Sequence, residues 1–390
     1  MAFLRHGCRV SAICPPGHPL RFVTGVEQLF LYKGLNSLGS LKACILAVQP
    51  DLIVPCDDGV VWQLHELHAQ NAAQRTLIER SLGAREAYPI IRNRGTFLQA
   101  AAQLGIRVPA TKTVTAEADV TAWDFQADAV LKRDGTWGGS GVIIVRSLPE
   151  ALTAFRKLHE PIGAGMAWKR WLVNCDPLAI WSWRRQEASS ITMQEFIPGH
   201  PANAMIACCQ GEVLGIISVE VLTTLGATGA ALVVRLIQNE EIQEAAQRVA
   251  RQLMLSGFYG LDFVLEQKTG AAYLIEINPR CTQLGHLRVP TRGDLAGAVS
   301  AKLRNELVQA MVPESRNLLP GDTVAFFPQA FKSNPHSPYL VNGSHDVPWE
   351  EPGLVLELLR DSWSERQWFS RIYHSFRDAD HQEEVNYETS

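Results

Sequence analysis

Residues 260–280, GLDFVLEQKTGAAYLIEINPR, are the stretch that decides the fold of this chain. Two apolar runs, at 261–266 and 272–277, are typical of short strands, and residues 267–270 between them are typical of a turn. The stretch therefore predicts a β-hairpin. Its unusual feature is that acids interrupt both apolar runs.

Four polar side chains of this hairpin are expected to gather on one face. Residues two apart along a strand point to the same side, so Glu276, Asn278 and Arg280 project together, and Asp262 can meet them from the paired strand. Carboxylate and amide oxygens suit Mg²⁺, and a guanidinium suits phosphate because it can bind two oxygens at once. Solvated acids on an ordinary hairpin are the alternative, but acids between apolar neighbours are costly to bury without a cation.

The order Asp-Phe-Val-Leu at 262–265 and Glu-Ile-Asn-Pro-Arg at 276–280 resembles the metal-binding hairpin of the ATP-grasp superfamily. In that family the residues matching Asp262, Glu276 and Asn278 hold the Mg²⁺ (or Mn²⁺) ions that bridge the ATP phosphates. The residue matching Arg280 contacts phosphate or the acyl-phosphate intermediate. The resemblance therefore implies ATP and a divalent cation as cofactors and a catalytic role for Arg280.

A second motif, AVLKRDGTWGGSGVIIVR at 129–146, places a glycine-rich loop between two β-rich runs. Glycines let backbone N–H groups approach oxyanions closely, and such a loop can close as a lid. It is neither a Walker A motif nor a dinucleotide fingerprint. It resembles the ATP-grasp lid loop, which implies nucleotide contacts from Gly138, Gly139 and Gly141, and a catalytic phosphate or adenine contact from Lys132. An ordinary turn and a lysine kept for solubility are the alternatives.

Two further segments complete the nucleotide site that the resemblance implies. The helix expected at 92–105 is opened in the family by a basic residue, usually Lys, that reaches the ATP phosphates, and Arg94 stands there. The segment ITMQEFIPG at 191–199 matches the hinge between the two halves of the site. It implies adenine-side contacts from Glu195, Phe196 and Ile197.

Arg235 stands in a strand expected at 231–237, and Asn203 directly precedes one expected at 204–209. The family that the chain resembles often places phosphate-side or metal-side groups at these positions. Arg235 is accordingly expected to bind the nucleotide. Biotin-dependent carboxylases of the superfamily carry a glutamate base a few residues after the arginine that matches Arg280, but Leu284 and Gly285 stand here. This departure argues against bicarbonate activation on biotin. His286 is equally well explained as a structural residue or as one facing the acyl acceptor.

Length and composition limit the class of protein. A chain of 390 residues predicts two to four compact units, and a net charge of −4 gives no electrostatic case for binding nucleic acid or an anionic membrane. No apolar run is long enough for a membrane span, and the amino terminus lacks the apolar core of a signal peptide. The eight cysteines form no C-x-x-C motif and are expected to be reduced thiols of a cytoplasmic protein.

The amino-terminal segment predicts a small parallel α/β domain over 1–90. Strands are expected at 9–13 and 52–55, a helix at 35–48, and a further helix capped by Asp57 and Asp58. It resembles the Rossmann-like preATP-grasp domain of the family, except that the chain opens inside a helix at 1–7. We therefore expect either an upstream start or a substitute for the first strand.

Two aromatic features stay open at this stage. His65 and His68 share one helix face, but no third ligand is near in sequence, which favours a packed or surface pair over a metal site. The Trp-rich segment 161–190 is explained either by packing of a small lid domain or by an aromatic substrate pocket or partner surface.

The prediction for the whole chain is an α/β and α+β protein with the ATP-grasp fold. Its parts are the preATP-grasp domain at 1–90, apparently without its first strand, a lobe with the glycine-rich lid at 91–195, a lobe with the metal-binding hairpin at 196–318, and an extension at 319–390. A strand is expected near 324–331.

The function that the resemblance implies is an ATP- and Mg²⁺-dependent ligase, with carbon–nitrogen bond formation favoured. It would activate a small-molecule carboxylate as an acyl phosphate for attack by an amine or another nucleophile. A nucleotide-binding regulatory or scaffold protein without turnover and a kinase-like member are the alternatives. Self-association into a homo-oligomer is left open.

Overall fold

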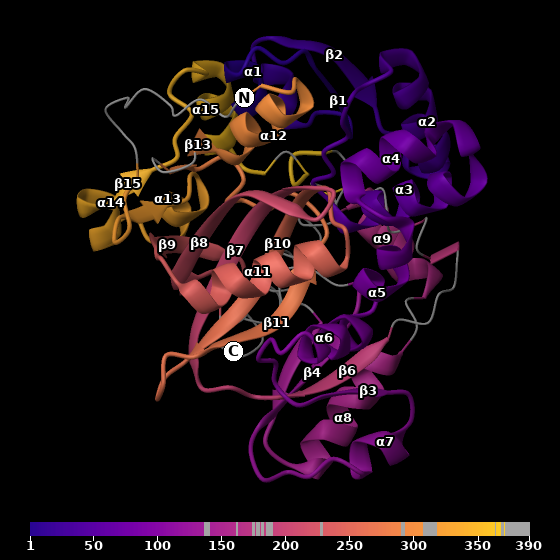
Figure 1. Cartoon of the computed structure of the whole chain (residues 1–390), viewed down its shortest axis with the longest axis vertical. Coiled ribbons are helices and arrows are strands. Elements are labelled where there is room, and N and C mark those ends of the chain that lie inside the picture. The colour runs from indigo at the N-terminus through magenta and orange to yellow at the C-terminus, as the bar shows by residue number, and fades with distance from the viewer. Residues whose placement is uncertain are drawn as a thin grey trace, which may run out of the picture.

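The computed structural model describes residues 1–135, 141–160, 163–173, 190–226, 229–289, 293–306, 318–362 and 364–367, and the single residues Asp176, Ile180, Trp183, Arg184 and Ser370. Along the chain, an amino-terminal unit is followed by a small antiparallel sheet and then by a large sheet (Figure 1). Within these described residues no helix is both long and apolar enough to cross a lipid bilayer. The division of the chain at 90, 195 and 318 stays a prediction.

The amino-terminal unit holds a parallel pair of strands, β1 (Val10–Cys14) and β2 (Val26–Leu31). Its helices are α1 (Ala2–Arg5), α2 (Ser37–Val48), α3 (Asp58–Gln70), α4 (Arg75–Leu82) and α5 (Tyr88–Arg92), with 3₁₀ turns η1 (Pro19–Phe22), η2 (Gly34–Asn36), η3 (Ala72–Gln74) and η4 (Arg85–Ala87). The apolar residues of α2, α3 and α4 pack into one core.

The strand expected at 52–55 is wrong, because the described chain there has no ladder partner. The backbone N–H of Ile53 instead donates to Ser81 Oγ at 2.9 Å, and the carbonyl of Pro55 accepts from Cys281 N at 3.0 Å. These two contacts join the segment to α4 and to the chain that follows the acidic hairpin. The second strand of the parallel pair is β2, which the sequence pattern did not reveal.

The small sheet is antiparallel throughout, in the order β3 (Thr111–Val114), β6 (Ile191–Glu195), β4 (Ala129–Arg133), β5 (Val142–Val145). The predicted strands on both sides of the glycine-rich loop are thus confirmed as β4 and β5. Helices α7 (Glu117–Thr121) and α8 (Leu148–His159) pack on this sheet, and α9 (Ala164–Leu172) follows them in the chain.

The large sheet contains the acidic hairpin at one edge. Its order is β11 (Ala272–Asn278), β10 (Gly257–Glu266), β7 (Gly199–Cys209), β8 (Glu212–Thr224), β9 (Ala231–Leu236), β14 (Thr323–Ala325), β15 (Ser344–His345). The predicted hairpin is confirmed as β10 and β11. The strand expected at 324–331 is only partly right, because β14 ends at Ala325 and helix α13 (Gln329–Ser333) begins soon after Pro328, which has no N–H for a ladder.

Different helices cover the two faces of the large sheet (Figure 1). Helices α11 (Glu240–Gln252) and α6 (Arg94–Gln103) cover one face, where Ile206, Leu261 and Phe263 are buried. Helix α12 (Leu295–Leu303) covers the other, with buried Met205 and Val219. The remaining elements are β12 (Arg288–Val289), β13 (Gly293–Asp294), α14 (Pro338–Asn342) and α15 (Pro352–Leu359).

Candidate functional site

The acidic hairpin brings together the carboxylates that its sequence pattern predicted. Asp262 on β10 lies directly opposite Glu276 on β11, and Asn278 Nδ2 donates to Asp262 Oδ2 at 3.0 Å. A fourth strand residue joins them: Asn203 on β7 is opposite Asp262 and donates from Nδ2 to Asp262 Oδ1 at 2.6 Å. Two carboxylates and two amides therefore converge on the sheet face that α12 covers further along.

Asp262 and Glu276 lie close enough for their negative charges to repel each other. Burial first, and the charge of Glu276 second, raise the pKa of Asp262 to about 6, against the amide hydrogen bonds that lower it. Burial also acts to raise the pKa of Glu276, but the cations Arg94 and Lys132 outweigh it, and the net shift is downward. A bound cation would relieve the repulsion that Asp262 feels.

Arg94, the first residue of α6, donates a hydrogen bond to the hairpin. The helix is capped by Asn93, whose Oδ1 accepts from Thr96 N at 2.8 Å. The glycine that follows, Gly95, lets α6 approach the small sheet, since a Cβ there would come within 2.4 Å of Thr113 Oγ1. This packing helps to place the Arg94 guanidinium between the two sheets.

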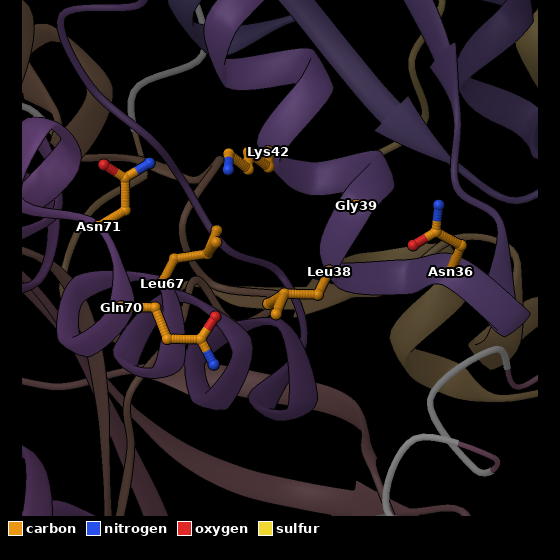
Figure 2. A pocket seen from close by; sticks show the side chains of 7 residues that line it. All are labelled: Asn36, Leu38, Gly39, Lys42, Leu67, Gln70 and Asn71. Atoms are coloured by element: carbon orange, nitrogen blue, oxygen red, sulfur yellow. The ribbon is translucent and has the colours of Figure 1, made fainter.

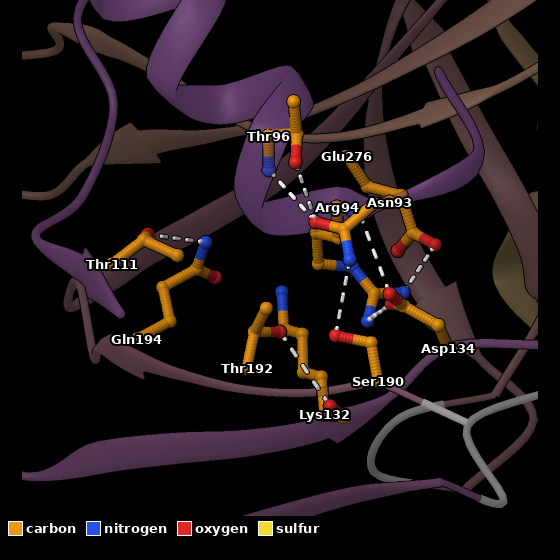
Figure 3. Close-up of polar contacts among 10 residues, drawn as sticks. All are labelled: Asn93, Arg94, Thr96, Thr111, Lys132, Asp134, Ser190, Thr192, Gln194 and Glu276. Atoms are coloured by element: carbon orange, nitrogen blue, oxygen red, sulfur yellow. Dashed lines mark hydrogen bonds and ion pairs between the residues drawn. The ribbon is translucent and has the colours of Figure 1, made fainter. Parts of the chain in front are cut away.

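The Arg94 side chain bonds to Glu276 of the large sheet and to Asp134, the residue after β4 of the small sheet (Figure 3). Its Nη2 donates to Glu276 Oε1 at 2.6 Å, and its Nη1 donates to Asp134 Oδ1 at 2.9 Å. The side chain is only 8% exposed, and burial acts to lower its pKa, but Glu276 and Asp134 together raise the pKa overall. Arg94 is thus held as a cation between the end of β4 and the acidic hairpin.

Lys132 is the second buried cation, on β4 of the lid hairpin. Burial first, and repulsion from Arg94 second, lower its pKa from 10.5 to about 8, although Glu276 and Asp262 act in the opposite direction. Its backbone carbonyl accepts from Thr192 Oγ1 at 3.5 Å (Figure 3). The Lys132 ammonium group is thus close enough to both hairpin acids for their charges to raise its pKa.

Arg280 leaves the hairpin in the direction of the amino-terminal unit. Its Nε lies 3.2 Å from Asp58 Oδ2, at the first turn of α3. Asp57 caps this helix, as predicted, by accepting from Gly59 N at 2.8 Å. Burial, with the neighbouring charge of Asp58, raises the pKa of Asp57 to about 6. Arg280 thus connects the carboxylate hairpin to a second pair of acids.

Two site acids escaped the sequence analysis. Asp134 follows the lid strand directly, and its position just before the glycine-rich loop was the only signal for it. Asp58 was expected only to cap a helix, whereas it pairs with Arg280. Both contacts join residues far apart in sequence, so no local pattern announces them.

The predicted adenine segment leads from the small sheet to the large one. The N–H of Glu195 donates to Ala110 O at 2.8 Å, and its Oε2 accepts from Ala110 N at 3.3 Å. The N–H of Phe196 donates to Asp128 O at 3.0 Å, and Ile197 is buried. Backbone N–H groups of Glu195 and Phe196 are therefore already used, and adenine contacts from this segment stay a prediction.

Of the three glycines predicted to contact the nucleotide, the structure describes Gly141. Gly141 precedes β5, and its carbonyl accepts from Arg133 N at 2.9 Å, which closes the base of the loop. Gly138 and Gly139 lie outside the described residues. Their proposed contact with phosphates stays a prediction.

Arg235 is not brought to this cluster. It alternates along β9 with Val234 and Leu236, which are buried on the face that carries Asp262, so Arg235 projects from the opposite face. There it lies beside Glu220, with Nη1 3.5 Å from Oε2.

The histidines noted in the sequence have packing partners. His65 stacks on Tyr88 with ring centroids 3.8 Å apart, and His68 Nε2 lies 2.7 Å from Glu79 Oε1. His286 lies 3.1 Å from Asp346 Oδ2. Across the described ranges, no group of three or more His, Cys, Asp or Glu side chains could hold a metal ion, so the histidine pair is best explained by packing.

A cavity of about 500 Å³ lies elsewhere, between α2 and α3 (Figure 2). Its lining residues are Asn36, Leu38, Gly39, Lys42, Leu67, Gln70 and Asn71. It contains no carboxylate and none of the predicted site residues. This cavity therefore does not include the acidic hairpin or its cations.

Comparisons with known proteins identify the fold that carries this hairpin. Residues 176–283 match the family model described as an ATP-grasp domain, which includes β7 to β11. No curated protein matches the chain.

Solved structures with similar folds cover most of the chain at low identity. The L-amino acid ligase from Bacillus licheniformis is 16% identical with a TM-score of 0.57, over 83% of this chain and 76% of that one. The N5-carboxyaminoimidazole ribonucleotide synthetase from Thermus thermophilus is 14% identical with a TM-score of 0.56, over 83% and 77%. The biotin carboxylase domain of the Hydrogenobacter thermophilus 2-oxoglutarate carboxylase, solved with MgADP and bicarbonate, is 15% identical with a TM-score of 0.57, over 82% and 69%.

At these identities the likeness of the structures establishes the fold. Together with the family match, it confirms the fold that the hairpin and the lid motif predicted. The chain carries an ATP-grasp domain within residues 176–283 and has the ATP-grasp fold over most of its length.

Proposed function

We propose that this protein is an ATP- and Mg²⁺-dependent ligase that activates a small carboxylate as an acyl phosphate and transfers it to an amine. The observation that carries the proposal is the pairing of Asp262 with Glu276 on one hairpin, with Arg94 bonded to Glu276 and the buried Lys132 close enough for both acids to raise its pKa. Arg280 follows the hairpin directly. The similar structures support it, since one is an L-amino acid ligase and another was solved with MgADP.

The residues present fit a magnesium ion. Asp262, Glu276, Asn278 and Asn203 offer hard oxygen donors on one face, and the remaining positions would be filled by water and phosphate oxygens, as Mg²⁺ prefers. Both amides now donate to Asp262, so ligation by their oxygens requires each amide to turn over. When bound, the ion neutralises phosphate charge and orients the γ-phosphoryl group.

The cations of the chain would neutralise the rest of the charge on ATP. Phosphoryl transfer to a carboxylate needs positioning and electrostatic stabilisation more than covalent help from the protein. Lys132 is buried on β4, and Arg280, 23% exposed, is more accessible than Arg94, which is 8% exposed. We assign Lys132 to the phosphates and Arg280 to the carboxylate as it becomes an acyl phosphate.

The chain departs from carboxylases that use biotin. Leu284 is buried, and a side chain at Gly285 would collide with Cys281, since its Cβ would lie 2.4 Å from Cys281 Sγ. Neither position can present the glutamate base that those enzymes use. This argues against biotin as the acceptor and supports an amine acceptor in its place.

The proposal is tested by incubating the protein with ATP, Mg²⁺ and mixtures of small carboxylates and amines, and by following ADP, phosphate and products by mass spectrometry. The expected result is release of ADP and phosphate that depends on both a carboxylate and an amine, with formation of an amide. The control is Glu276→Gln, which should lose this release.

Other outcomes would replace the proposal. Binding of ATP without turnover for any pair would indicate a regulatory nucleotide-binding protein. ADP release with a phosphorylated product and no free phosphate would indicate a kinase-like enzyme.

A further inference from the structure

Arg94 is bonded to the same acid that the proposed metal ion needs. Its guanidinium bonds Glu276 at 2.6 Å and Asp134 at 2.9 Å, and the Arg94 backbone N–H also lies 3.4 Å from Asp134 Oδ2. The third guanidinium nitrogen, Nε, is buried and has no hydrogen-bond partner among the described residues. One buried cation therefore bridges both sheets and is not fully satisfied where it lies.

This contact has a consequence for any divalent ion at the hairpin. A cation at Asp262 and Glu276 would lie beside the Arg94 charge, and like charges in a poorly solvated site repel strongly. Glu276 would also have to divide its oxygens between the two. Binding of the metal is therefore opposed for as long as Arg94 stays on Glu276.

Asp134 offers Arg94 a second position. Its backbone is held by the small sheet, because Asp134 N donates to Ser190 O at 2.8 Å. Its carboxylate also accepts from the Arg94 backbone, so it stays beside the start of α6 whichever way the Arg94 side chain turns. Asp134 also leads directly into the glycine-rich loop.

We propose that Arg94 is the counter-ion of Glu276 in the metal-free protein, and that Asp134 is a positioning residue that holds Arg94 when a divalent cation takes Glu276. This inference rests on the proposed function, since it takes the hairpin to be the metal site. Loading of the metal then leaves Asp134 as the acid partner of Arg94 and releases Arg94 Nη2 from Glu276.

The test is Mn²⁺ binding to the nucleotide-free protein, followed by electron paramagnetic resonance. Arg94→Gln removes the competing charge, so it should bind Mn²⁺ about tenfold more tightly than the unmodified protein. Asp134→Asn leaves Arg94 on Glu276 alone, so it should bind Mn²⁺ several-fold more weakly. Arg107→Gln breaks the exposed 2.7 Å pair with Glu241 and should leave the affinity unchanged.

The double variant separates positioning from a general structural effect. If Asp134 acts through Arg94, Asp134→Asn should have no effect in the Arg94→Gln background, whereas an ordinary structural role would lower the affinity in both. Circular dichroism and thermal unfolding of each variant show whether it is folded.

Several outcomes would overturn the inference. They are weaker or undetectable Mn²⁺ binding by folded Arg94→Gln, or an equal loss from Asp134→Asn in both backgrounds. Because no ATP, carboxylate or amine is present, these results can fail while amide formation by the intact enzyme succeeds, and the reverse also holds.

Discussion

Two arginines approach the same acidic hairpin, and their surroundings differ. Arg94 comes from α6, is 8% exposed, and bonds directly to a hairpin carboxylate, Glu276. Arg280 belongs to the chain just after the hairpin, is 23% exposed, and reaches away from it to Asp58. The difference shows that residue type alone does not decide surroundings: one arginine balances the charge of a hairpin carboxylate, and the other pairs with an acid of the amino-terminal unit.

Removal of the acid that Arg94 contacts should have the largest effect. Glu276→Gln keeps the shape of the side chain but removes a ligand charge, so ATP turnover should fall about a thousandfold or more. The measurement is steady-state ADP release over a range of Mg²⁺ concentrations, with Arg107→Gln as the control. Full turnover by the variant at saturating Mg²⁺ would remove the hairpin from the metal site.

Changing the other arginine should separate activity from stability. Arg280→Met should lower kcat/KM for the carboxylate about a hundredfold, because the charge on the acyl phosphate is no longer balanced. It should also lower the free energy of unfolding by about 1–3 kcal/mol, because Asp58 is left partly buried without its ion pair.

A second substitution tests that explanation of the Arg280 variant. Adding Asp58→Asn to Arg280→Met should restore much of the stability, measured by urea unfolding, but none of the activity. Recovery of activity in the double variant would show that Arg280 serves the fold and does not contact substrate.

A pH profile distinguishes the lid lysine from both arginines. A lysine is charged below its pKa, and burial with repulsion from Arg94 lowers the pKa of Lys132 to about 8. The charge available to phosphate is therefore lost as pH rises through about 8, and kcat/KM for ATP should fall about tenfold per pH unit above it. Lys132→Arg, which stays charged, should move this limb to higher pH, and a limb that stays at 8 in that variant belongs to another group.

The smallest effect is expected on the opposite face of the large sheet. Arg235 lies beside Glu220 there, and both side chains are partly exposed. Arg235→Gln should change the KM for ATP by less than about twofold, since exposed pairs contribute little. A larger rise in KM would mean that Arg235 contributes to ATP binding although it lies on the opposite face of the sheet from Asp262.

The acidic hairpin and the strands β4 and β5 could be predicted from the sequence because both are local patterns. Asp262 and Glu276 are acids in otherwise apolar alternating runs, and a glycine cluster marks the loop between β4 and β5. The fold followed from these motifs and their order. Strand 52–55 was mispredicted because an apolar run shows that a segment is buried, not that it has a ladder partner.

The site beyond the hairpin could be predicted only in part. Arg94 was placed from its position at the start of a helix, but its bond to Glu276 joins residues 182 positions apart. Asp134 and Asp58 enter the site through similar distant contacts, which depend on how α6 and α3 pack. Arg235 was assigned from its strand alone, and the alternation along β9 directs it to the other face.

The route through an acyl phosphate is tested most directly by following oxygen. In the proposed reaction a carboxylate oxygen attacks the γ-phosphorus of ATP and releases ADP, then the amine attacks the acyl carbon and phosphate leaves with that oxygen. With a carboxylate substrate labelled with ¹⁸O, mass spectrometry should find one ¹⁸O atom in each phosphate released. Unlabelled phosphate, formed while the amide accumulates, would contradict the account.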